Sequence, residues 1–181
     1  MKAKETKAAA AAIKRIFATV ENVDKAQYKG QYKTGDMYSF FGPFITMTAD
    51  APIPGIPELD NIGQTDPATF LQNYIDNPRY RRSCRDYHTP EHVPTLEELK
   101  AWRRQEDGKN LAFPIQDGDQ QIGVSTRYLI DLMTVFPGLR LYVSGPLDII
   151  ILSDENLQPV AGIAPVILDL NRKGIAKRRT A

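Results

Sequence analysis

The pattern of hydrophobic and polar positions divides the chain into two similar halves separated by a stretch of different character. Residues 6–20 place apolar side chains at helical spacing, and residues 26–49 then alternate with aromatic and β-branched residues, as strands do. The same order, a helix followed by strands, recurs over residues 125–168. A repeated order of elements is typical of an internally symmetric fold.

The first half, residues 1–57, is predicted to contain a helix, a hairpin and a connector. One face of the helix over residues 6–20 consists of five apolar residues: Ala9, Ile13, Ile16, Phe17 and Val20. The turn sequence Thr34-Gly35-Asp36 predicts a hairpin among the strands that follow. Three prolines within residues 51–57 exclude a helix or a central strand there, so this stretch is predicted to be an extended connector.

The second half, residues 110–170, is predicted to run from a strand into a capped helix and then into three further strands. Ser125 or Thr126 caps the helix, and Pro137-Gly138 ends it. The three predicted strands are residues 139–143, 149–152 and 160–168.

Between the halves lies an insertion, residues 58–109, which is predicted to be mostly helical. Pro67 begins a short helix that Asn77-Pro78 ends. Thr95 and Glu98 have the spacing of a capping box and open a second helix.

These elements predict an α+β fold in a single domain. The two helix-plus-strands halves are expected to form antiparallel sheets with two helices packed on one side. A length of 181 residues suits one domain with an insertion, and 42% hydrophobic residues is ordinary for a globular chain. The expected segments are 1–57, 58–109, 110–170 and a basic tail, 171–181.

Basic charge is concentrated at the two ends of the chain, although the net charge is only +1. Residues 1–57 contain eight Lys and Arg against five Asp and Glu, and residues 171–181 contain five against none. Four basic residues share one face of the first helix: Lys4, Lys7, Lys14 and Arg15. Such a stripe either lines a nucleic-acid surface or is a solvated helix face.

One short stretch contains the residue types that bind zinc. Cys84, His88 and His92 are spaced four apart, which would place them on one side of a continuous helix. Pro90 disfavours that helix, and the chain has no further Cys or His to complete a tetrahedral set. We therefore expect a surface loop here, with no metal and no cofactor.

The sequence gives no positive indication of catalysis. There is no Gly-rich phosphate loop and no recognisable pair of catalytic carboxylates, so the chain is not expected to be an enzyme. The arginines and tyrosines of residues 79–87 either grip phosphate or pair with the acids nearby.

Cysteine content and hydropathy bear on the cellular compartment. A single Cys excludes an internal disulfide and fits a reducing environment. No apolar stretch reaches the ~20 residues that span a bilayer. A cytoplasmic location without membrane contact is expected.

The stretch from Val124 to Pro165 resembles the second half of a domain of the bacterial DNA sliding clamp, the processivity factor of DNA polymerase III. The matching features are the run Val124–Leu132 that opens the helix, Pro137-Gly138 that closes it, and the strands that follow. The ending Ala164–Leu168 is similar to the proline-containing last strand of such clamps. Residues 6–49 are similar to the first half, so the resemblance covers roughly half to two-thirds of the chain.

This resemblance implies a non-enzymatic, clamp-like binding protein in DNA replication or its regulation, of phage or mobile-element origin. Five residues would then face duplex DNA: Lys4, Lys7, Lys14, Arg15 and, from the second helix, Arg127. Clamp rings contain six such domains and this chain has the length of one. Exposed strand edges would therefore join copies into a homo-oligomer. Replication proteins would be further partners.

The alternative is an interaction or scaffold module of the same fold that binds protein and no DNA. Its partner surface would be formed by aromatic residues of the insertion and by a proline of the last strand: Tyr80, Tyr87, Trp102 and Pro165. A metal-dependent enzyme built on Cys84, His88 and His92 is a third hypothesis.

Overall fold

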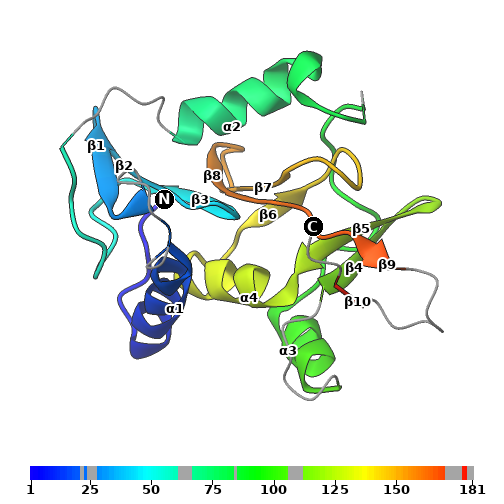
Figure 1. Cartoon of the computed structure of the whole chain (residues 1–181), viewed down its shortest axis with the longest axis horizontal. Helices are drawn as coiled ribbons and strands as arrows, with labels where there is room; N and C mark the ends of the chain where they lie inside the picture. The colour runs from blue at the N-terminus through cyan, green and yellow to red at the C-terminus, as the bar shows by residue number, and fades with distance from the viewer. Residues whose placement is uncertain are drawn as a thin grey trace.

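The computed structural model describes residues 1–20, 23, 28–60, 67–83, 85–105, 112–169 and 177–178. The described part of the chain is an α+β fold in which helices cover both faces of an antiparallel sheet (Figure 1). Most of the basic tail and Cys84 lie outside the described residues.

The sheet has six strands, and every neighbouring pair is antiparallel. Their order across the sheet is β1 (Gln31–Thr34), β2 (Met37–Phe41), β3 (Ile45–Ala49), β8 (Pro159–Ile163), β7 (Ile150–Ser153) and β6 (Arg140–Tyr142). The last strand of each half, β3 and β8, pair at the centre, where Ile45 lies opposite Ile163. Each half therefore contributes one three-stranded meander, and the two meanders mirror each other in order.

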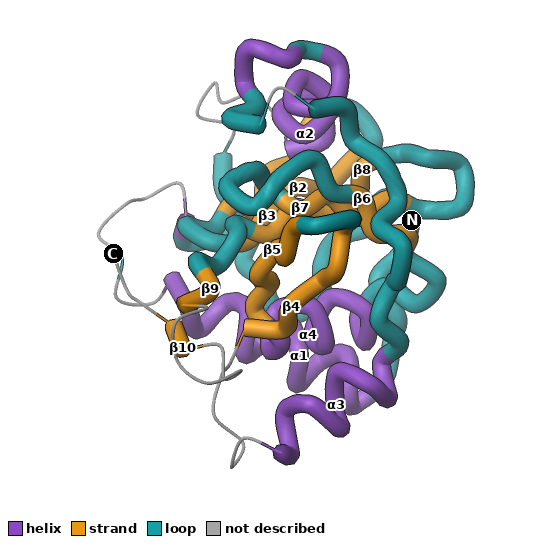
Figure 2. Tube along the Cα trace, turned by 90° about the vertical axis from the view of Figure 1, so that its right-hand side faces the viewer, coloured by secondary structure: helices purple, strands orange, loops and turns teal. Residues whose placement is uncertain are grey.

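Four α-helices surround this sheet: α1 (Lys7–Phe17), α2 (Pro67–Asp76), α3 (Leu96–Gln105) and α4 (Thr126–Val135). The helix of the first half, α1, and the helix of the second half, α4, lie on one face of the sheet, as the sequence predicted. They pack against each other there. α2 packs against β2, β3 and β8 on the opposite face, and α3 packs against α4 (Figures 1 and 2). Within the described ranges, the 3₁₀ turn Ala18–Val20 extends α1 and the 3₁₀ turn Pro78–Tyr80 follows α2.

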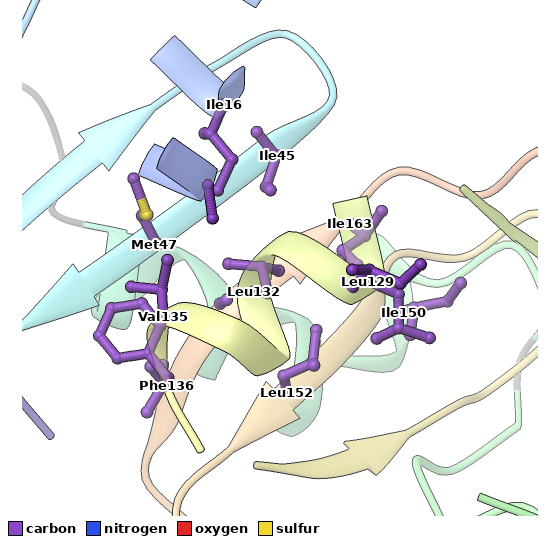
Figure 3. Close-up of a cluster of buried hydrophobic side chains, with 14 of the residues drawn as sticks. Ile16, Ile45, Met47, Leu129, Leu132, Val135, Phe136, Ile150, Leu152 and Ile163 are labelled. Atoms are coloured by element: carbon purple, nitrogen blue, oxygen red, sulfur yellow. The ribbon is translucent and has the colours of Figure 1, made fainter. Parts of the chain in front are cut away.

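The main core lies between the sheet and the pair α1 and α4 (Figure 3). Fully buried side chains from α4, such as Leu129 and Leu132, meet alternate residues of the central strands, such as Met47 and Ile150. Each such side chain removed from water contributes about 1.5–3 kcal/mol. Because successive side chains of a strand point to opposite faces, β2 contributes to both layers. Phe40 enters this core, whereas Phe41 faces α2.

The opposite face of the sheet is closed by α2 at very short range. Phe41 packs edge-on against Phe70, with ring centroids 6.1 Å apart. A Cβ added to Gly162 would lie 2.6 Å from Leu71 Cδ2. The absence of a side chain at Gly162 is therefore what lets α2 lie so close to β8.

Hydrogen bonds connect the insertion to the second half of the chain. The buried carboxylate of Asp148 accepts hydrogen bonds from the backbone N–H of Arg82 (2.5 Å) and of Ser83 (3.1 Å), and from the Ser83 hydroxyl. The backbones of His88 and Val143 exchange two hydrogen bonds of 2.9 Å each. These bonds fix the loop between α2 and α3 beside β6.

Two parts of the β structure differ from the sequence predictions. The stretch predicted as one strand over residues 160–168 is divided, because Pro165 has no N–H to donate. Ala164 N–H bonds to the Phe44 carbonyl and Val166 N–H bonds to the Gly123 carbonyl, so the chain crosses from the sheet to a separate hairpin. That hairpin consists of β4 (Ala112–Asp117), which the sequence did not predict, and β5 (Gln120–Ser125). A short pair, β9 (Leu168–Asp169) and β10 (Lys177–Arg178), follows.

Candidate nucleic-acid interface

The first helix displays its lysines because its apolar face is anchored in the core. Thr6 accepts a hydrogen bond from the backbone N–H of Ala9 at 3.1 Å and so caps the helix. The residues that face the sheet are buried: Ala9, Ala12, Ile13 and Ile16. Lys7 and Lys14 lie on the opposite side and are exposed. The small alanines between them leave both lysine stems free to extend into solvent.

Lys4 lies just before this helix and is also exposed. Its backbone N–H donates to the carbonyl of Val135 at 2.8 Å, which fixes the segment beside the end of α4. Within the part of the chain that the structure describes, the side chains of Lys4, Lys7 and Lys14 form no ion pair. Three of the five predicted DNA contacts are therefore available to an anion.

The other two predicted contacts, Arg15 and Arg127, take part in an ion pair inside the protein. Asp131 of α4 is fully buried, and it accepts hydrogen bonds from Arg15 Nη2 at 2.5 Å and from Arg15 Nε at 3.0 Å. Arg127 lies 3.9 Å from the same carboxylate and donates to the Arg15 carbonyl at 3.2 Å. These contacts join α1 to α4. Because 41% of the Arg15 side chain is exposed, its outer side still faces solvent.

Burial governs the ionisation of this carboxyl group. It raises the pKa of Asp131, and the guanidinium groups of Arg15, Arg127 and Arg103 oppose part of that rise. Arg103 belongs to α3, so all three helices on this side of the sheet bring a cation toward one carboxylate. The result is a cluster in which the arginines outnumber the single acid.

The basic residues of α3 are functional candidates that the sequence reasoning did not select. Lys100, Arg103 and Arg104 line a hollow of about 460 Å³ together with Ile130 of α4. The sequence signal for them was a basic last turn on a predicted helix. Over the whole insertion, residues 58–109, ten Asp and Glu outnumber eight Lys and Arg, which obscured that signal. Such a count takes no account of where the acids lie in the fold.

The aromatic residues proposed for a protein partner do not form one surface. Tyr80 is 53% exposed and packs against Tyr74 on the α2 side of the molecule. Tyr87 is half-buried, donates to the Ile149 carbonyl at 2.8 Å, and has a pKa raised by that burial. Trp102 packs edge-on against Phe113, with ring centroids 5.5 Å apart, on the side of α3. The fourth predicted contact, Pro165, is half-buried where the chain leaves β8.

The residues of the zinc hypothesis are directed to separate partners. His88 Nε2 lies 2.7 Å from Asp117, whereas His92 Nε2 lies 3.1 Å from Glu98. Cys84 is outside the described residues, and among the residues that are described no three His, Cys, Asp or Glu side chains are arranged to hold a metal ion.

A second hollow, of about 340 Å³, is apolar and lies on the α2 side of the sheet. It is lined mainly by aromatic and aliphatic side chains, among them Phe41, Phe44, Phe70 and Ile149. Phe44 is 48% exposed at its edge. Among the described residues, its lining contains no cluster of titratable side chains and is predominantly apolar.

Comparisons with known proteins do not assign the chain to a family. No protein-family model, curated protein or solved structure matched it. As for the membrane, none of the helices in the described ranges has the length and apolar character required to cross a bilayer.

Proposed function

We propose that this protein is a non-enzymatic, clamp-like binding protein that holds duplex DNA against the outer face of α1 and α4, in DNA replication or its regulation. The observation that carries the proposal is the exposed row of Lys4, Lys7 and Lys14, which has no ion pair among the described residues. Flexible cations displayed on a rigid helix contact phosphates without reading base sequence, which is what a protein that tracks along DNA requires.

The arrangement of the two halves supports the clamp-like part of the proposal. Each half supplies one helix and one three-stranded meander, the helices lie side by side, and β3 and β8 join the halves. This is the symmetry that the sequence resemblance to a sliding-clamp domain leads us to expect. One chain supplies one such domain, so a ring would require several copies.

The proposal is tested by fluorescence anisotropy with a labelled DNA duplex, between about 50 and 200 mM salt. The parent protein is expected to bind more weakly as salt rises. A variant with Lys4→Gln, Lys7→Gln and Lys14→Gln is expected to lose at least about tenfold in affinity and to have a shallower salt dependence, by about 1 unit per lost phosphate contact.

A matched control removes three cations from the other side of the molecule. Arg79, Arg82 and Arg140 are exposed, and Arg140 alternates with the core residue Leu141, which directs it away from α1 and α4. Changing these three to Gln alters the net charge equally, and it also tests the alternative phosphate contact at residues 79–87. The proposal expects this variant to keep nearly the parent affinity. Equal losses in the two variants would mean that the lysine row is not the binding surface.

A second candidate function, binding of a protein partner without DNA, is favoured by the apolar hollow beside the exposed Phe44. This scaffold hypothesis expects the parent protein to ignore the duplex at every salt concentration. The same titration therefore distinguishes the two functions.

A further inference from the structure

The insertion contributes a helix to the same side of the sheet as the lysine row. α3 packs against α4, and Figure 2 shows α1, α4 and α3 together beneath the sheet, with α2 on the opposite side. α4 therefore lies between a basic helix of the first half and a basic helix of the insertion.

The two acids of α3 lie in its first turn and already have partners there, and its last turn is basic. Glu98 accepts from the Thr95 backbone N–H at 2.7 Å and so completes the capping box that starts the helix. Glu97 pairs with Lys100 at 2.9 Å. Both acids lie in the first turn, whereas Arg103 and Arg104 lie in the last. In the described parts of the chain neither arginine has an ion-pair partner within 4.0 Å.

The hollow between α3 and α4 combines these cations with an apolar wall. Lys100, Arg103 and Arg104 line it from α3, and Ile130 lines it from α4. A nucleic-acid backbone has the matching composition, because its phosphates are anionic and the sugars between them present apolar C–H groups. The described residues of the lining include no carboxylate, and the nearby Glu97 is paired with Lys100. Arginine guanidinium groups also bind phosphate oxygens in bidentate geometry.

We propose that Lys100, Arg103 and Arg104 form a second phosphate-contacting row, so that one DNA duplex is held by α1 on one side of α4 and by the insertion helix α3 on the other. This inference rests on the proposed function and extends it, because it assigns a DNA contact to a segment outside the two symmetric halves. The α3 row contacts the backbone and adds affinity without sequence preference.

The test compares three variants of the full chain that each replace three cations by Gln. One carries Lys100→Gln, Arg103→Gln and Arg104→Gln. The second removes the lysine row of α1, and the third is the control at Arg79, Arg82 and Arg140. Affinity for the labelled duplex is measured against salt concentration, and circular dichroism verifies that each variant is folded.

The α3 variant is expected to lose at least about tenfold in affinity and to lower the salt slope by about 2–3 units, since each lost phosphate contact contributes about 1. Combined with the α1 variant, it is expected to reduce binding further. If the α3 variant keeps the salt dependence of the parent while the α1 variant loses it, this inference is wrong and the proposed function stands. A parent protein that does not bind the duplex overturns both.

Discussion

At the scale of single residues, the ion pair between Arg15 and Asp131 decides which cations remain available to a ligand. Asp131 has no solvent contact and would be costly to bury without a partner. Arg15 balances the negative charge of Asp131 through three hydrogen bonds, so its own positive charge is partly neutralised inside the protein. The lysines of the same helix have no comparable acid among the described residues, which is why they carry the proposal for DNA binding.

His88 is a second residue whose surroundings set its charge. Its Nδ1 lies 2.9 Å from the Asp86 carbonyl oxygen and its Nε2 lies 2.7 Å from the Asp117 carboxylate. Both partners accept hydrogen bonds, so the doubly protonated ring is the form that satisfies both of them. The bond to the Asp86 carbonyl and the bond to Asp117 raise the pKa of His88, which burial and the nearby Arg85 oppose.

The raised pKa makes stability depend on pH in a defined direction. A histidine whose pKa is higher in the folded than in the unfolded state stabilises the fold fully below its ordinary pKa of 6.5. That contribution is lost as pH rises through the folded pKa. A His88→Gln variant should therefore fall furthest below the parent in free energy of unfolding at about pH 5.5, and the gap should narrow by pH 8.5.

Urea denaturation of both proteins at the two pH values measures this effect. Because the His88 side chain is 43% exposed, the loss at low pH is expected to stay near or below about 1 kcal/mol. His92→Gln provides the control, since that side chain lies in an exposed pair with Glu98. A gap for His88→Gln that widens as pH rises would contradict the assigned pair.

At the scale of elements, the close approach of α2 to the sheet depends on one missing side chain. Gly162→Ala would place a methyl group 2.6 Å from Leu71, which is fully buried. Overpacking of this kind costs about 1–3 kcal/mol of unfolding free energy. Denaturant unfolding of the variant is expected to show a loss in that range.

A double-mutant cycle separates the clash from other effects of the substitution. Leu71→Ala removes the nearest group that the new methyl would meet, so the Gly162→Ala penalty should be smaller in that background. Ile149 and Thr46, each with an atom 3.1 Å from the added Cβ, account for the part that remains. Equal penalties in both backgrounds would mean that the methyl meets something other than Leu71.

Elements with strong local signals were predictable from the sequence, and elements defined by distant partners were not. α1 was predicted from its apolar periodicity, α2 from Pro67 and α3 from its capping box, and each has formed there. α4 also begins where predicted, although the Ser125 side chain makes no capping hydrogen bond. β4 was not predicted because it is defined by its pairing with β5 and not by a local sequence pattern. The strand predicted over residues 160–168 was divided because Pro165 cannot donate to a ladder.

At the scale of the whole molecule, the two edges of the sheet limit how copies could join. β1 is partly covered at one end, where Gln31 exchanges hydrogen bonds with Pro57 and Leu59. β6 is followed by Val143, whose backbone is already paired with His88. Considering the described residues alone, the uncovered lengths of edge are Tyr32–Thr34 and Arg140–Tyr142. Any edge-to-edge contact through them would be short.

The clamp-like proposal predicts self-association despite these short edges. Light scattering at about 150 mM salt is expected to give a mass several times the 20.3 kDa of one chain, and more so with a DNA duplex present. A mass of one chain at all concentrations, with and without the duplex, would favour the scaffold hypothesis.

The sequence by itself determined the α+β class, the two-half order of elements, the capping box of α3 and the lysine face of α1. These features depend on neighbouring residues, through helical periodicity, capping and turn chemistry. Only the tertiary structure decided that Arg15 and Arg127 meet Asp131, that the Tyr80 and Trp102 side chains lie on opposite faces, and that α3 lies beside α4. Such pairings are chosen by packing between segments far apart in the chain, which local patterns do not encode.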